Sequence, residues 1–119
     1  MPYVDGFVIP VPKKHLGTYR TIARKAAKVW REHGALEVLE CSGDDLATKF
    51  GKSFPKLVKL KRGETVVFSW IRFKSRADRD RVNAKVMKDP RMNRMMKNVK
   101  MPFEVKRMTY GGFKVMVNG

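Results

Sequence analysis

Two segments of the sequence carry apolar residues on both faces of an extended chain, as buried strands at the centre of a sheet do. Residues 3–11 (YVDGFVIPV) alternate between two largely apolar faces, and the proline at position 12 ends the run. Residues 65–73 (TVVFSWIRF) show the same pattern more strongly. Both segments are therefore predicted to be central strands that are covered on both sides.

A helical spacing replaces this alternation between residues 13 and 33. Side chains recur there at steps of three and four and form one stripe, made of Leu16, Tyr19, Ala23, Ala26, Trp30 and His33. Arg20 and Arg24 fall off this stripe with other basic residues, on what we expect to be the outer face. Gly34 follows the stripe, as glycine often does just past a helix end.

Two further helices are predicted in the second half of the chain. Ser75 is a suitable N-cap for a helix over residues 76–88. The Asp-Pro pair at 89–90 interrupts that helix, and a short methionine-rich helix is expected over residues 91–98.

The remaining extended segments are more polar. We expect an edge strand over residues 35–41, a short extra strand over 53–61 with a hairpin turn at 61–64, and a last strand over 108–117. Two glycines at 111–112 indicate a bulge or a close backbone approach.

This order of elements is that of a ferredoxin-like β-α-β-β-α-β unit of the α+β class, formed by one domain over residues 1–119. In such a unit the two apolar strands lie in the centre, and the helices cover only one face of the sheet. The other face stays apolar, and a second copy of the chain is its natural cover. We therefore expect a homodimer in which two sheets form an α/β barrel.

The composition narrows the classes of protein that fit. The chain has 119 residues, 43% of them hydrophobic, with 27 Lys or Arg, 11 Asp or Glu and a net charge of +16. One cysteine excludes an internal disulfide scaffold and a cysteine-based zinc site, and with two histidines no transition-metal site is expected. No apolar run reaches the roughly 18 residues of a membrane span, and the N-terminus lacks a signal-peptide pattern. These features predict a soluble cytoplasmic protein with no membrane contact.

Short stretches along nearly the whole chain match a known family in the same order. They are YVDGFV (3–8), EHGAL (32–36), EC (40–41), VVFSWI (66–71), RD (79–80), DPRM (89–92), MPF (101–103), KRM (106–108) and YGGF (110–113). Through them the sequence resembles the YbaA-like family of bacterial proteins, which belongs to the dimeric α/β-barrel class. The resemblance implies that fold, but no reaction, because related families include cofactor-free monooxygenases, haem-degrading enzymes and small binding or stress proteins. We expect no cofactor.

Asp5 is the clearest candidate for a catalytic group. It lies among apolar residues on a predicted strand, where burial would raise the pKa of its carboxyl and suit it to acid or base chemistry near neutral pH. The alternative is a carboxylate paired with an arginine or with backbone donors. His33 is either a pocket residue or a side chain that satisfies the negative end of its helix.

Four further candidates come from the second half of the chain. Ser69 and Trp70 lie on opposite faces of their strand, so only one of them can face the barrel interior. Arg79 and Asn83 share one side of their helix with buried valines, where polar groups need partners. A Trp, an Asn and a His also occur in haem-degrading members of this fold class, which the resemblance makes relevant to Trp70, Asn83 and His33.

Tyr19, Glu40, Cys41 and Arg79 are candidates for ligand contacts. A Cys–His nucleophile formed by Cys41 and His33 is not expected, because the strand that separates them spans about 20 Å. Nearby carboxylates also disfavour a thiolate. Cys41 is expected to be a small, buried apolar residue.

Two residue clusters have both a structural and a binding interpretation. Residues 35–48 hold four acids and no Lys or Arg. They form either a counter-patch for the basic flanks or an oxygen-rich cation site, although their spacing matches no calcium loop. The methionines of the last third either fill the core or line a pliable pocket; they are Met87, Met92, Met95, Met96, Met101 and Met108.

The positive charge is spread over several elements, and residues 13–31 alone carry seven basic groups and no acid. Such a field favours contact with polyanions, or it serves solubility alone. Three functions stay open: binding of a small organic molecule between sheet and helices, with cofactor-free oxidation as an extension; non-specific nucleic-acid binding; and a structural or regulatory dimer without chemistry.

Overall fold

The computed structural model describes residues 1–98 and 100–119, and these form a four-stranded sheet in the order β2-β3-β1-β4. The central strands are β1 (Tyr3–Pro12) and β3 (Glu64–Phe73), and the edge strands are β2 (Glu37–Ser42) and β4 (Thr109–Lys114). Every neighbouring pair is antiparallel. The predicted ferredoxin-like α+β class and the central place of the two apolar strands are confirmed.

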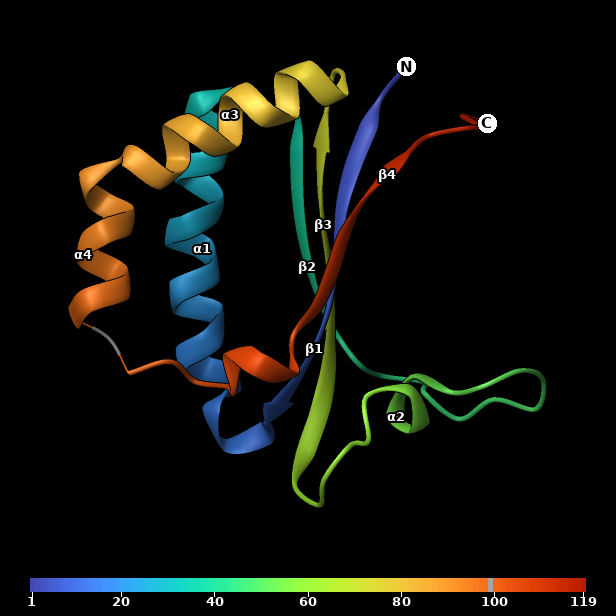
Figure 1. The fold of residues 1–119 in the computed structure, drawn as a ribbon. Helices are drawn as coiled ribbons and strands as arrows, with labels where there is room; N and C mark the ends of the chain where they lie inside the picture. Colours follow the sequence, from blue (N-terminus) through green and yellow to red (C-terminus); the bar gives the residue numbers. More distant parts are fainter. Residues whose placement is uncertain (99) are drawn as a thin grey trace.

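The three longer helices lie on one face of this sheet (Figure 1). A 3-10 turn (Lys13–His15) leads into α1 (Leu16–His33), which is followed after β3 by α3 (Arg76–Lys88) and α4 (Pro90–Asn98). Ser75 Oγ accepts a hydrogen bond of 3.1 Å from the Asp78 amide, which confirms the predicted N-cap. A second 3-10 turn (Val105–Arg107) leads into β4.

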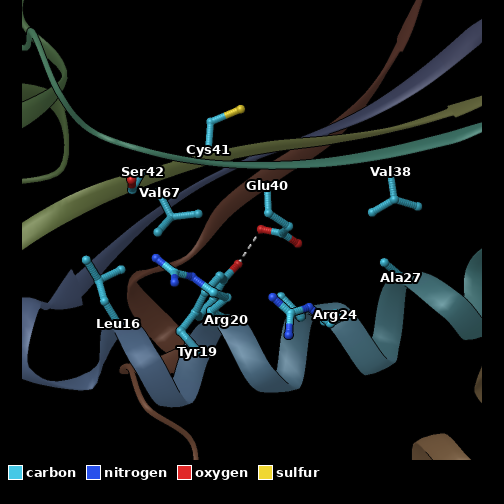
Figure 2. Close-up of a pocket in the computed structure, with 11 residues that line it drawn as sticks. Leu16, Tyr19, Arg20, Arg24, Ala27, Val38, Glu40, Cys41, Ser42 and Val67 are labelled. Carbon is cyan, nitrogen blue, oxygen red and sulfur yellow. Dashed lines mark hydrogen bonds between the residues drawn. The ribbon is translucent and has the colours of Figure 1, made fainter.

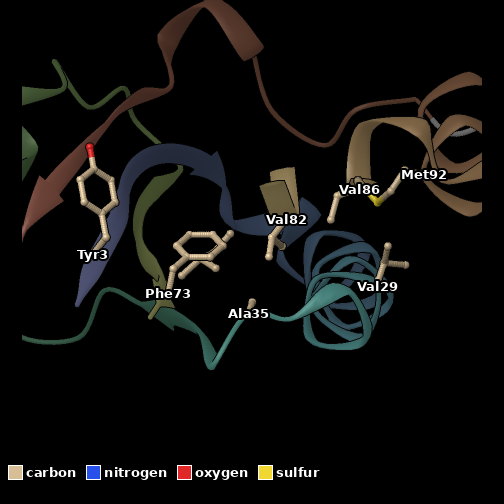
Figure 3. Packing of buried hydrophobic residues seen from close by; sticks show 8 residues of the cluster. Tyr3, Val29, Ala35, Phe73, Val82, Val86 and Met92 are labelled. Carbon is tan, nitrogen blue, oxygen red and sulfur yellow. The ribbon is translucent and has the colours of Figure 1, made fainter. Parts of the chain in front are cut away.

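The core lies between the sheet and the helices in two clusters. In the first, side chains of β1 and β3 meet side chains of the three helices; its members are Tyr3, Val29, Ala35, Ile71, Phe73, Val82, Val86 and Met92 (Figure 3). In the second, Tyr19 and Ala23 of α1 pack on the other end of the same strands. Val29 lies outside the predicted stripe but is 2% exposed, because α3 and α4 cover a second side of α1.

The predicted extra strand over residues 53–61 is wrong, because this segment contains the short helix α2 (Phe54–Leu57). Ser53 Oγ accepts a hydrogen bond from the Lys56 amide, and Pro55 occupies the first turn. The turn at residues 61–64 does form, but it connects α2 to β3 rather than closing a hairpin.

The last strand is shorter than predicted and ends at Lys114. Its partner β1 begins at Tyr3, which lies opposite Lys114, so residues further along have no strand to pair with. A single backbone hydrogen bond from Val115 to Pro2 continues the ladder. Met116 and Val117 are exposed.

The face of the sheet opposite the helices is apolar and largely open. Phe113 is 62% exposed there, Leu39 40% and Phe68 39%. Gly6 lies opposite both Trp70 and Gly111. Because glycine has no side chain, a hollow of about 430 Å³ is left in this face. Helix α2 covers only one end of this face (Figure 1). There Phe54 packs edge-on against Phe68.

Candidate ligand-binding site

A cavity of about 330 Å³ lies between α1 and the strands β2 and β3 (Figure 2). Its apolar walls come from both layers and consist of Leu16, Ala23, Ala27, Val38 and Val67. Its polar lining includes Tyr19, Arg20, Arg24 and Glu40. Apolar walls with a few convergent polar groups are typical of small-molecule sites, and this volume is near the lower end of their range.

Tyr19 and Glu40 form the polar floor of this cavity. Tyr19 Oη donates a hydrogen bond of 2.7 Å to Glu40 Oε1, from the first turn of α1 to the edge strand β2. Glu40 belongs to an exposed strand, but its carboxyl is turned under α1 (Figure 2). Ser69, opposite Glu40 on β3, is 3% exposed and places its side chain on the same side of the sheet.

Burial is the main cause of the shifted pKa values of Tyr19 and Glu40. It raises the pKa of the Glu40 carboxyl, while hydrogen bonds from the hydroxyls of Tyr19 and Ser69 act in the opposite direction. Burial also raises the pKa of the Tyr19 hydroxyl, and the negative charge of Glu40 adds to this effect. Tyr19 therefore remains a hydrogen-bond donor, and Glu40 can exchange a proton closer to neutral pH than an exposed carboxyl can.

Arg20 and Arg24 lie one helical turn apart and border the same cavity. Within the part of the chain that the structure describes, neither guanidinium has a carboxylate within 4.0 Å. Both are exposed, as predicted for the basic outer face. They follow Tyr19 and Ala23 of the stripe directly, so they lie at its edge and also border the cavity.

Cys41 is exposed, so the prediction of a buried apolar cysteine is wrong. It follows Glu40 on an edge strand and therefore projects from the opposite side of β2, where it lies across from Phe68 (Figure 2). Cys41 borders the cavity, but its thiol points away from Tyr19 and Glu40.

The candidates Asp5, Arg79 and Asn83 come together in the interior, away from this cavity. Arg79 Nε lies 3.2 Å from Asp5 Oδ1, and Arg79 Nη2 donates a hydrogen bond of 3.0 Å to Tyr3 Oη. Asn83 Nδ2 donates to Asp5 Oδ2 at 3.4 Å, and Asn83 Oδ1 accepts a hydrogen bond of 3.1 Å from Trp30 Nε1.

Asp5 is 8% exposed, and burial raises the pKa of its carboxyl against the opposing effects of Arg79 and Asn83. Neither Asp5 nor its two partners border the cavity beneath α1. The geometry matches the alternative in which Asp5 is an arginine-paired carboxylate. This cluster joins α3 to the sheet.

His33 lies at the end of α1 and meets the junction of α3 and α4. Its Nε2 atom lies 2.8 Å from Asp89 Oδ2, and Asp89 also binds the side chain and backbone amide of Arg91. Hydrogen bonds from Arg91 and His33 hold the pKa of the Asp89 carboxyl well below its usual range. This arrangement gives His33 a structural role, but its partner is Asp89 and not the last carbonyls of its own helix.

The remaining candidates are divided between the two faces of the sheet. Ser69 faces the helices, whereas Trp70 lies on the open face, where its Nε1 donates a 3.0 Å hydrogen bond to Glu37. The three candidates suggested by haem-degrading proteins therefore lie in separate places; they are Trp70, Asn83 and His33.

The acidic and methionine-rich segments give no second site. Among the described residues, no three His, Cys, Asp or Glu side chains are arranged to hold a metal ion, and no helix is long and apolar enough to cross a membrane. Met92 is buried in the core, and Met95 and Met108 pack against the core clusters. Met87 and Met96 are exposed.

Comparison with known proteins identifies the family. The sequence matches the family described as "Protein of unknown function (DUF1428)" over residues 2–105. The chain belongs to this family. It is also 44% identical to "Uncharacterized protein YbaA" of Escherichia coli (strain K12) and to the protein of the same name from Shigella flexneri, over 99% of each chain. The resemblance to the YbaA-like family is thus confirmed.

Solved structures of distant sequence share the fold of this DUF1428 member. Rv0793 from Mycobacterium tuberculosis is 13% identical with a TM-score of 0.60, over 99% of this chain and 98% of that one. A dimeric ferredoxin-like protein from an uncultured marine organism is 14% identical with a TM-score of 0.58, over the whole of both chains. A nipsnap family protein from Agrobacterium tumefaciens is 16% identical with a TM-score of 0.59, over 96% of this chain and 87% of that one.

Proposed function

We propose that this chain is a single-domain, cytoplasmic homodimer that binds a small organic molecule in the cavity beneath α1 of each subunit. The observation that carries the proposal is the cavity itself, in which the hydrogen-bonded Tyr19–Glu40 pair lies among apolar walls. Polar groups fixed in an apolar site orient a ligand and select it.

The open face of the sheet supports the homodimer. Phe113, Phe68 and Leu39 project from it, and an apolar face of this kind is costly to leave in water. The hollow at Gly6 and Gly111 is shaped to receive a large side chain of a second copy. The structural likeness to a dimeric ferredoxin-like protein favours the same occupant.

Glu40 gives this site a group for proton transfer. Its carboxyl has a raised pKa and borders the cavity, so it is suited to remove a proton from a bound molecule near neutral pH. Cofactor-free oxidation by dioxygen would begin with such a step, because the carbanion formed on an activated CH2 group can add dioxygen and then lose water, so that CH2 and O2 give C=O and H2O. We propose this reaction as an extension of the binding function.

A variant that fills the cavity tests the binding function. Ala27→Phe places a ring between α1 and Val38, whereas Ala84→Phe adds the same ring to the exposed side of α3. A panel of small carboxylates, amides and phenols is titrated against each variant by ligand-observed NMR at millimolar concentrations. Binding that A27F abolishes and A84F retains is the expected result. Equal binding by both variants, or no binding to the unaltered chain, contradicts the proposal.

Non-specific polyanion binding is the second candidate, and a basic groove between α1 and α4 favours it. The groove has a volume of about 400 Å³ and is lined by Lys25, Lys28, Val29, Arg91, Arg94 and Met95. Basic side chains beside a groove bind phosphates through counterion release. In filter binding with tRNA, K25Q/K28Q should weaken binding several-fold and flatten its salt dependence. Absence of binding to the unaltered chain at about 50 mM salt would contradict this second function.

A further inference from the structure

We infer that the cavity beneath α1 selects organic carboxylates with a compact apolar body, whose charge pairs with Arg20 and Arg24. This inference rests on the proposed binding function and names the class of ligand. It assigns a role to two residues that the sequence pattern placed on an outer face.

The first argument is that two exposed arginines, which have no carboxylate partner in residues 1–98 and 100–119, border this cavity. Several arginines near the interior of this chain are paired: Arg79 with Asp5, Arg91 with Asp89 and Arg107 with Glu64. Arg20 and Arg24 have no such partner among the described residues, although both border a cavity.

The second argument is their geometry. Residues four apart on a helix lie on neighbouring turns of the same side, so the two guanidiniums present their donors to one region. Figure 2 shows both side chains beside Tyr19 on α1, with the Arg20 guanidinium between α1 and β2 in this view. A planar guanidinium matches a planar carboxylate with two parallel hydrogen bonds, and charge-assisted bonds of this kind are stronger than neutral ones.

The third argument concerns the body of the ligand. Leu16, Ala27 and Val38 provide apolar walls beside the arginines. A bare inorganic anion would leave these walls in water, whereas a ring or short alkyl chain covers them. The volume of about 330 Å³ suits a molecule of that size.

Glu40 is the one acidic side chain that lines the cavity among the described residues, and it opposes a bound anion. Tyr19 holds its carboxyl at the floor, on the strand side, and burial favours its protonated form. Replacing Glu40 by glutamine removes the charge but keeps an acceptor for the Tyr19 hydroxyl. This substitution should therefore increase the affinity for carboxylates.

The test compares carboxylates with their uncharged amides, which have nearly the same shape. The probes are benzoate and benzamide, 3-phenylpropionate and 3-phenylpropionamide, and hexanoate and hexanamide, titrated by ligand-observed NMR. We expect each carboxylate to bind the unaltered chain about tenfold more tightly than its amide. R20Q/R24Q should abolish this preference, and E40Q should raise carboxylate affinity several-fold.

A matched control is K25Q/K28Q, which removes the same charge from the same helix outside this cavity. It should retain the preference for carboxylates, and circular dichroism should show the same helix content for every variant. Equal binding of acids and amides overturns the inference while leaving the binding function intact. Loss of the preference in K25Q/K28Q but not in R20Q/R24Q also overturns it. If neither series binds, the proposed function fails as well.

Discussion

Tyr19 Oη lies 2.7 Å from Glu40 Oε1, and this hydrogen bond ties the first turn of α1 to the edge strand β2. Tyr19→Phe leaves the Glu40 carboxyl without its donor from α1. Loss of such a bond should lower the free energy of unfolding by about 1–2 kcal/mol. Urea unfolding at neutral pH measures the change. An unaltered midpoint would show that water replaces the tyrosine at no cost.

Breaking the ion pair of Arg79 and Asp5 should lower the free energy of unfolding by more than loss of the Tyr19 hydroxyl does. Arg79→Met removes the guanidinium and leaves the Asp5 carboxyl buried beside Asn83 alone. An uncompensated buried charge should lower the free energy of unfolding by about 3 kcal/mol. The double variant D5N/R79M should recover part of this loss, because the buried charge is gone. If D5N/R79M is no more stable than R79M, the two residues are not coupled.

Two carboxyls with lowered pKa values predict a loss of stability in acid. Hydrogen bonds from Arg91 and His33 lower the pKa of Asp89, and hydrogen bonds from Arg107 lower that of Glu64. In the unfolded chain both groups take up protons near pH 4, so the folded chain loses this stabilisation as the pH falls from there.

The raised pKa values of Asp5 and Glu40 have the opposite sign. They favour the folded chain at low pH and reduce its stability as the pH rises past the unfolded values.

D89N should lose more stability at pH 7 than at pH 3, as measured by urea unfolding. At pH 3 the Asp89 carboxyl of the unfolded chain is already largely protonated, whereas in the folded chain its lowered pKa keeps it charged, so only part of the stabilising effect is lost. Equal losses at both pH values would contradict the assigned role of the Asp89 charge.

Gly112 is predicted to be intolerant of any side chain. A Cβ atom at this position would collide with Tyr3 Oη and Arg79 Nη2, which are side-chain atoms and not the backbone that the glycine pair predicted. At Gly17, on α1, an added Cβ atom would meet no other group within 4 Å. Thermal unfolding should show that G112A lowers the midpoint, whereas G17A raises it through helix propensity, by up to about 1 kcal/mol. A neutral G112A would contradict the close packing of β4 against β1.

The fold could be predicted from the sequence where one pattern dominated a segment. The apolar residues of β1 and β3 follow a pattern that fits a strand and not a helix. Both strands lie in the centre of the sheet, as predicted. The alternation over residues 53–61 predicted a strand wrongly, because it is short. The N-cap at Ser53 and the proline at position 55 favour a helix there instead. The end of β4 depends on where β1 begins, which no local pattern contains.

The candidate site was only partly accessible to such reasoning. Tyr19 and Glu40 were candidates, but their contact depends on how α1 packs over β2. Arg20 and Arg24 are exposed, as the basic outer face predicted, but a helical stripe does not reveal that its edge borders a cavity. Asp5 was a candidate because it was expected to be buried. Its partner Arg79 lies 74 positions away in the chain, so no local pattern joins the two residues.

The homodimer is tested most directly by sedimentation equilibrium of three chains at micromolar concentration. Phe113→Lys places a charge on the open face, and Met87→Lys places the same charge on the exposed side of α3. The unaltered chain and M87K should sediment as dimers, and F113K should shift towards the monomer. A stable monomer of the unaltered chain, or a dimer that F113K leaves unaffected, would contradict the assembly through this face.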